Sequence, residues 1–200
     1  MTIVIGLTGS IGMGKTTTAR LLKEAGAAIF DADACVHNLY AEGGEAVAGI
    51  AQLFPEAVQN NTVNRQKLSQ VVLKNPDAIK EIEALVHPLV AIKRQAFLDK
   101  TKAENTKYAV FDVPLLLENG GDEAVDIVLV VTAPESIQKQ RVLARPGMTV
   151  EKFQALRNRQ MPENEKKARA DYVIYTDKGE DDARRQIQII LEDIEKNAVK

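Results

Sequence analysis

Short apolar runs and amphipathic stretches alternate along most of the chain. Residues 3–7 form an almost unbroken apolar run, which is typical of a parallel strand buried on both faces. Similar runs predict four further strands, at residues 27–30, 108–113, 127–131 and 172–175. Strands that alternate with helices indicate a parallel α/β sheet.

The segments between these strands carry helical patterns. A first helix is expected from Lys15, with Gly26 where a left-handed C-terminal cap would lie. Further helices are expected at residues 134–145 and from about Thr149. The last helix has the clearest apolar face, formed by Ala183, Ile187, Ile190, Leu191 and Ile194.

Residues 34–106 separate the second and third predicted strands by far more than a minimal crossover, and they look largely helical. Asn75-Pro76 predicts the start of a helix, because Asn caps helices and Pro suits the first turn. His87-Pro88 is expected to interrupt that helix before another begins. We therefore expect a single domain over residues 1–200, with an inserted helical region at about 34–106.

Composition narrows the class of protein. A chain of 200 residues suits one domain, and its net charge of −2 argues against a nucleic-acid binder that relies on bulk positive charge. Cys35 is the only cysteine, so no intrachain disulfide can form, which fits a reducing compartment. The N-terminus lacks a basic leader region, and no stretch approaches the roughly 18 apolar residues of a spanning helix. A cytoplasmic protein with no membrane partner is expected.

The segment that joins the first strand to the first helix carries the chemistry. Residues 9–16 read G-S-I-G-M-G-K-T and match the P-loop pattern G-x-x-x-x-G-K-[S/T] in full. Glycines let backbone N–H groups converge on phosphate oxygens, and the N-terminus of the following helix favours anions. Lys15 can reach the β- and γ-phosphates, and the Thr16 hydroxyl can ligate Mg²⁺. The expected nucleotide contacts are Gly9, Ile11, Gly12, Met13, Gly14, Lys15, Thr16 and Thr17.

The pattern thus predicts the binding of a nucleoside triphosphate and Mg²⁺ on a P-loop NTPase-like parallel sheet flanked by helices. Two further features favour phosphoryl transfer over hydrolysis. The guanine-reading motif N-K-x-D of regulatory GTPases does not occur. Hydrolytic ATPases usually place Glu after the acidic residue that ends the third strand, whereas Val113-Pro114 follows Asp112 here. A phosphotransferase is therefore expected.

Besides Lys15, three further charged side chains are candidates for catalysis. Asp33 follows the second strand, where the carboxyl ends of a doubly wound sheet face the ligand. It can act as the general base for an acceptor hydroxyl, the alternative being a simple turn aspartate. Arg141 and Arg145 are four residues apart and share a helix face, ahead of a polar segment that suggests a lid at about residues 141–169. Asp31 is ambiguous between turn former, supporting partner and metal-water ligand.

Taken in order, these motifs resemble the dephospho-coenzyme A kinase family over nearly the whole chain. The residues that carry the resemblance are Gly6-Leu7-Thr8-Gly9, Asp31-Ala32-Asp33, His87-Pro88, Val113-Pro114-Leu115-Leu116, Glu118, Arg141, Arg145, Gln160-Met161-Pro162, Lys166 and Ala170-Asp171. The P-loop alone is shared by many families, whereas the ordered set is far more specific.

The resemblance implies transfer of the γ-phosphoryl group of ATP to the 3′-hydroxyl of dephospho-CoA, the last step of coenzyme A synthesis. It also implies that Asp33 is the base, that the helical insert binds the acceptor, and that His87, Pro114 and Leu115 lie on the acceptor side. Two departures stand out. Pro146 replaces a usual acidic residue after the lid arginine, and Thr176-Asp177-Lys178-Gly179 replaces a usual Asn-containing turn after the last strand.

Two alternatives remain open at this stage. One is a P-loop kinase with another small hydroxyl acceptor, such as a nucleoside, a nucleotide or a shikimate-like molecule. The other is a nucleotide-dependent switch, which the missing N-K-x-D already disfavours. Cys35 and His37 lie near Asp33, but two such ligands are too few for a metal site.

Overall fold

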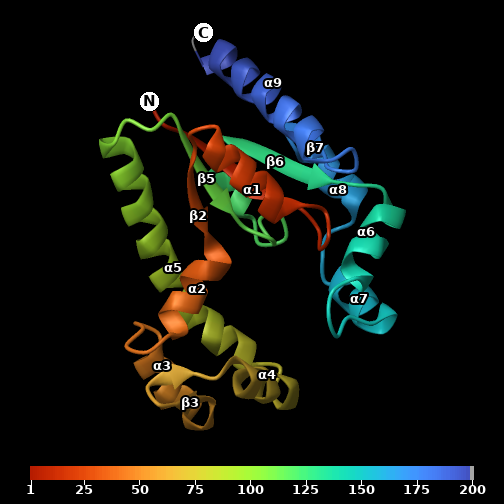
Figure 1. Ribbon diagram of the computed structural model, residues 1–200. Coiled ribbons are helices and arrows are strands. Elements are labelled where there is room, and N and C mark those ends of the chain that lie inside the picture. Colours follow the sequence, from red (N-terminus) through yellow and green to blue (C-terminus); the bar gives the residue numbers. More distant parts are fainter. Residues whose placement is uncertain (199–200) are drawn as a thin grey trace. The chain divides into compact units, whose positions relative to one another are not determined.

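A computed structural model of the chain describes residues 1–198. The chain forms two compact units, which we describe separately (Figure 1). Unit 1 comprises Met1–Ile29 and Thr101–Lys200, and unit 2 comprises Phe30–Lys100. The second unit is therefore inserted in the sequence of the first.

Unit 1 is built on a five-stranded sheet with the strand order β2-β5-β1-β6-β7, of which only the last two residues of β2 belong to unit 2. The strands are β1 (Ile3–Thr8), β2 (Ala28–Asp31), β5 (Tyr108–Asp112), β6 (Ile127–Thr132) and β7 (Tyr172–Tyr175), which confirms each predicted strand within a residue at either end. The pairings of β1 with β5, β1 with β6 and β6 with β7 are parallel. Because β1 lies in the middle of the sheet, the P-loop leaves the sheet at its centre.

Side chains of the sheet alternate between two apolar layers. Leu129 and Val131 of β6 belong to the cluster that also holds residues of α1 and α9, whereas Val128 and Val130 contact Leu116 on the other side. The helices of unit 1 are α1 (Lys15–Glu24), η2 (Gly121–Ala124), α6 (Glu135–Leu143), α7 (Val150–Arg157), α8 (Glu163–Ala168) and α9 (Glu180–Ala198). The predicted apolar face of α9 is confirmed, since all five of its residues are buried.

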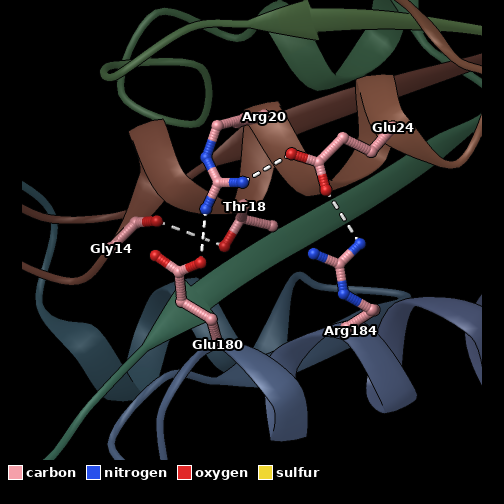
Figure 2. Close-up of polar contacts among 6 residues, drawn as sticks. All are labelled: Gly14, Thr18, Arg20, Glu24, Glu180 and Arg184. Atoms are coloured by element: carbon pink, nitrogen blue, oxygen red, sulfur yellow. Dashed lines mark hydrogen bonds and ion pairs between the residues drawn. The ribbon is translucent and has the colours of Figure 1, made fainter.

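Helix α1, which begins at the P-loop, is joined to α9 by a chain of ion pairs (Figure 2). Arg20 contacts Glu24 at 2.5 Å and Glu180 at 2.5 Å, and Arg184 contacts Glu24 at 2.8 Å. These side chains are exposed, so solvent screens each pair and its contribution to stability is small. The apolar contacts beneath them determine how α1 and α9 pack.

Unit 2 has its own apolar cluster, formed mainly by helices. Its elements are α2 (Ala32–Tyr40), α3 (Val47–Leu53), η1 (Pro55–Ala57), β3 (Val58–Gln59), β4 (Thr62–Val63), α4 (Arg65–Lys74) and most of α5 (Ala78–Ala103). Leu39, Ile50, Leu68, Ile82 and Val86 are buried in this cluster. The expectation of a largely helical segment is confirmed.

One local prediction in unit 2 was wrong, and one element was not foreseen. His87-Pro88 does not interrupt the helix, because α5 continues through Pro88 without a break. Apolar side chains reach the cluster on both sides of the proline, Val86 before it and Leu89 after it, and this packing offsets the roughly 3 kcal/mol that an interior proline costs. The short hairpin of β3 and β4 was also not foreseen.

Candidate active site

The P-loop connects β1 to α1 and adopts a conformation that depends on glycine at two positions. Gly12 has φ 78° and Gly14 has φ 95°, both in the left-handed region that other residues rarely adopt. Gly14 is also the N-cap of α1, so the loop runs directly into the first turn of the helix. The predicted strand, loop and helix order is therefore what places Lys15 and Thr16 at a helix N-terminus.

Carbonyl groups of this loop have hydrogen-bond donors in the protein, whereas several of its amide groups have no acceptor. The Ile11 carbonyl accepts a hydrogen bond from Gln138 Nε2 at 2.8 Å, and the Gly14 carbonyl accepts from Thr18 N and Oγ1 (Figure 2). By contrast, five backbone amides of the loop and of the first turn of α1 have no acceptor anywhere within residues 1–198. These free amides are those of Gly12, Gly14, Lys15, Thr16 and Thr17. Unpaired N–H groups at a helix N-terminus form an anion site.

Lys15 is fixed by a carboxylate from the neighbouring strand. Its Nζ lies 2.5 Å from Oδ1 of Asp112, the last residue of β5, and the two side chains are 18% and 7% exposed. The parallel register of β1 and β5 sets Leu7 opposite Asp112, which brings the carboxylate to the edge where the P-loop begins. The ammonium group is thus held by Asp112 at this edge of the sheet before any substrate binds.

The residues around Lys15 suit a magnesium ion that also binds phosphate. Thr16 is exposed in the first turn of α1, so its hydroxyl is available as a ligand. Within the described part of the chain, no three His, Cys, Asp or Glu side chains gather in a way that could hold a metal. Mg²⁺ commonly takes few protein ligands and completes its shell with water and substrate phosphates. The residues present therefore fit a Mg²⁺ ion that binds together with a nucleotide.

The segment after α7 contacts the first half of the P-loop. Gln160 Oε1 accepts a hydrogen bond from Ile11 N at 3.0 Å, and Ser10 Oγ donates to Glu163 Oε2 at 3.0 Å. The sequence indicated a lid near these positions but no contact with the loop. No local pattern reveals such a contact, since about 150 residues separate the partners in the chain.

A buried ion pair anchors this segment to unit 1. Lys166 is fully buried, and its Nζ lies 2.8 Å from Glu118 Oε1, which also accepts from Met161 N at 2.8 Å. Burial tends to raise the pKa of Glu118, but the ion pair with Lys166 and the hydrogen bond from Met161 N outweigh it and hold the pKa below its ordinary value of 4.5. The family motif residues Glu118, Met161 and Lys166 therefore form one connected group.

Arg141 and Arg145 lie in different environments although they are four residues apart. Arg141 Nη1 donates to Thr176 Oγ1 at 2.8 Å, and its Nη2 donates to Thr176 O at 2.7 Å. Arg145 is exposed, and its side chain has no hydrogen-bond or ion-pair partner within residues 1–198. Of the two, Arg145 is the arginine available to an incoming ligand.

The remaining predicted positions divide between the units. In unit 1, the Pro114 carbonyl accepts from Thr8 Oγ1 at 3.1 Å, and Leu115 is 37% exposed.

In unit 2, Asp33 is exposed in the first turn of α2, and His87 is exposed on α5. Asp31 is the N-cap of α2, where its Oδ1 accepts from Ala34 N at 2.9 Å.

None of the helices within residues 1–198 is both long and apolar enough to cross a membrane.

Comparisons with known proteins bear on the same elements. The family model for dephospho-CoA kinase matches residues 3–182. A dephospho-CoA kinase from Brucella melitensis is 50% identical over 189 residues, covering 94% of each chain, and one from Ruegeria pomeroyi is 50% identical over 194 residues, covering 97% of this chain and 96% of the other.

A crystal structure from Thermus thermophilus is similar throughout, with a TM-score of 0.82, 33% identity and coverage of 96% of this chain and 97% of the other. A dephospho-CoA kinase from Campylobacter jejuni has a TM-score of 0.73 at 24% identity, which supports the fold. With a family match across most of its length and relatives at half identity, this chain belongs to the dephospho-CoA kinase family.

Proposed function

We propose that this kinase transfers the γ-phosphoryl group of ATP to the 3′-hydroxyl of dephospho-CoA, with the P-loop of unit 1 as the phosphate site. A bond forms between the 3′-oxygen and the γ-phosphorus while the bridge to the β-phosphate breaks, so the products are CoA and ADP. The hydroxyl proton passes to a base on the protein.

One observation carries the phosphate site. The amides of Gly14, Lys15, Thr16 and Thr17 have no protein acceptor, and Lys15 stands beside them with its charge already positioned by Asp112. Donors that are oriented before the reaction stabilise charge in the transition state without further reorganisation. In this role the amides hold the β- and γ-phosphates, and Lys15 stabilises the negative charge that develops between them in the transition state.

Asp33 is the proposed base. An exposed carboxylate at the start of α2 is open to an acceptor hydroxyl, and the neighbouring Asp31 fixes the helix turn that presents it. General bases of this kind contribute roughly 10²- to 10⁴-fold to the rate. The family resemblance implies that His87, Pro114 and Leu115 each contact the acceptor, and these contacts are proposed.

Mg²⁺ is the proposed cofactor, with the Thr16 hydroxyl as its protein ligand. When bound, the ion would neutralise negative charge on the β- and γ-phosphate oxygens. Arg145 is proposed to contact the transferring group, because its guanidinium is exposed and unpaired within the described chain. We also propose a cytoplasmic enzyme that uses small-molecule substrates and no nucleic-acid or membrane partner, in keeping with its slight net charge and single cysteine.

The test is direct. The protein is incubated with ATP, Mg²⁺ and dephospho-CoA, and the products are separated and identified by mass and by ³¹P NMR. CoA carrying a 3′-phosphate, formed in step with ADP, is the expected result. A parallel panel of nucleosides, nucleotides and shikimate identifies any other acceptor. Turnover of one of these with none of dephospho-CoA would replace the proposed acceptor but keep the kinase.

A further inference from the structure

Thr176, the first residue after β7, contacts the P-loop at Met13 and Gly14. Its hydroxyl lies 2.8 Å from the Met13 carbonyl oxygen, and the side chain is almost fully buried. A longer contact joins the same hydroxyl to the Thr132 carbonyl at 3.3 Å. Thr176 stands 163 residues from Met13 in the chain, so no sequence pattern links the two.

Arg141 determines the direction of this hydrogen bond. A guanidinium group only donates, so the 2.8 Å contact from Arg141 Nη1 makes the Thr176 oxygen an acceptor there. The single hydroxyl hydrogen is then available to a carbonyl, and that of Met13 is the nearer. The second bond of Arg141, from Nη2 to Thr176 O at 2.7 Å, holds the residue in place.

The pinned carbonyl orients the next amide. The Met13 carbonyl and the Gly14 N–H belong to one planar trans peptide unit, in which they point in opposite directions. Holding the carbonyl towards Thr176 therefore turns the Gly14 N–H away from Thr176, and this amide is one of those without a protein acceptor. The Thr176 side chain also packs on Gly14, since a Cβ there would lie 3.0 to 3.1 Å from its atoms.

We propose that Thr176 is a positioning residue for phosphate binding, whose hydroxyl, oriented by Arg141, fixes the Met13–Gly14 peptide so that its amide faces the anion. This deepens the proposed function, because it rests on the P-loop being the phosphate site. Loss of one such hydrogen bond is expected to weaken binding about tenfold, whereas loss of the Thr176 methyl group is not.

The experiment measures binding of ATP and of inorganic tripolyphosphate by calorimetry, without any acceptor, to four proteins. Thr176→Val keeps the shape and removes the hydroxyl, and Thr176→Ser keeps the hydroxyl. Thr132→Val is the matched control, because the Thr132 hydroxyl is buried and has no hydrogen-bond partner in the described structure. Melting temperatures show whether each variant is folded. If Thr176→Val is unfolded, Thr176→Ala is measured in its place.

The expected result is an approximately tenfold weaker Kd for both ligands in Thr176→Val, with wild-type values in Thr176→Ser and in the control. Tripolyphosphate has no base, so an equal loss for both ligands locates the effect at the phosphates. Three results would overturn the proposal: unchanged affinity in Thr176→Val, equal loss in Thr176→Ser, or loss for ATP alone. If the wild-type protein binds neither ligand, the proposed phosphate site itself fails.

Discussion

The two units each carry a charged group that the proposed reaction requires, and they hold it in opposite ways. Lys15 of unit 1 is mostly buried and paired with Asp112. Asp33 of unit 2 is exposed, and its side chain has no partner among residues 1–198. The comparison indicates that the proposed phosphate site is organised in advance, whereas the proposed base would acquire its partner only with the acceptor. Changes in unit 1 should therefore affect nucleotide binding, and changes in unit 2 the transfer step.

Lys15→Ala should have the largest effect. It removes the ammonium group that Asp112 holds at the P-loop, so we expect turnover to fall by about 10³-fold or more. Steady-state assays with saturating dephospho-CoA measure the loss, and circular dichroism checks that the fold survives. Turnover within tenfold of wild type would show that the amides alone hold the phosphates.

Asp33→Asn tests the other side of the comparison. We expect kcat to fall by roughly 10²- to 10⁴-fold with little change in ATP affinity, since the amide cannot accept the proton. Asp31→Asn is the matched control, because Asn caps a helix about as well as Asp and should leave activity nearly intact. Near wild-type turnover of Asp33→Asn would mean that the base is elsewhere.

Lys166→Met should destabilise unit 1 strongly. It leaves the Glu118 carboxylate buried without its cation, at an expected cost of about 3–5 kcal/mol in the free energy of unfolding. Replacing both partners with apolar residues, Glu118→Leu with Lys166→Met, should recover much of this loss, because no charge then remains buried. Urea denaturation measures both, and an additive double variant would contradict the pairing.

The same pair predicts a dependence on acid. The folded pKa of Glu118 lies below its ordinary value of 4.5, so the unfolded chain binds the proton more readily. The contribution of Glu118 to stability is then complete above about pH 4.5 and is lost as the pH falls through the lower folded pKa. Glu118→Gln should flatten the slope of unfolding free energy against pH in that window, and an unchanged slope would exclude the assignment.

Gln160→Ala should have the smallest effect. It removes the acceptor of the Ile11 amide, so we expect the Kd for ATP to rise by about three- to tenfold, the range of one neutral hydrogen bond. Gln154→Ala, on the exposed side of α7, is the matched control. A fall in kcat without a change in Kd would instead assign Gln160 to the transfer step and weaken the division between the units.

Local patterns predicted most elements, and the exceptions have physical causes. The prediction that the helix breaks at Pro88 was wrong, because it considered only the local cost of a proline inside a helix. The packing of Val86 and Leu89 in the apolar cluster stabilises α5 on both sides of the proline. The hairpin of β3 and β4 was missed although Asn60 and Asn61 both have positive φ, the geometry of a tight hairpin turn. Helix α8 was missed because its polar sequence has no apolar periodicity.

The site shows the same division. The P-loop was predicted residue by residue, because its chemistry is contained in consecutive positions. The different surroundings of Arg141 and Arg145 were not predicted. A spacing of four residues indicates that the two side chains share a helix face, but it does not indicate that Arg141 contacts Thr176. Likewise, the contact of Gln160 with Ile11 has no counterpart in any local pattern.

The amino-acid sequence by itself determined the order of strands and helices, the phosphate-binding loop and the family, because hydrophobic periodicity and motif spacing act over a few neighbouring residues. The tertiary structure alone decided which distant side chains complete the loop: Asp112 for the lysine, Gln160 and Glu163 for its first half, Thr176 for its second. Asp112 and Thr176 reach the loop because parallel strands bring their carboxyl ends to one edge of the sheet, whereas Gln160 and Glu163 reach it from the segment that follows α7.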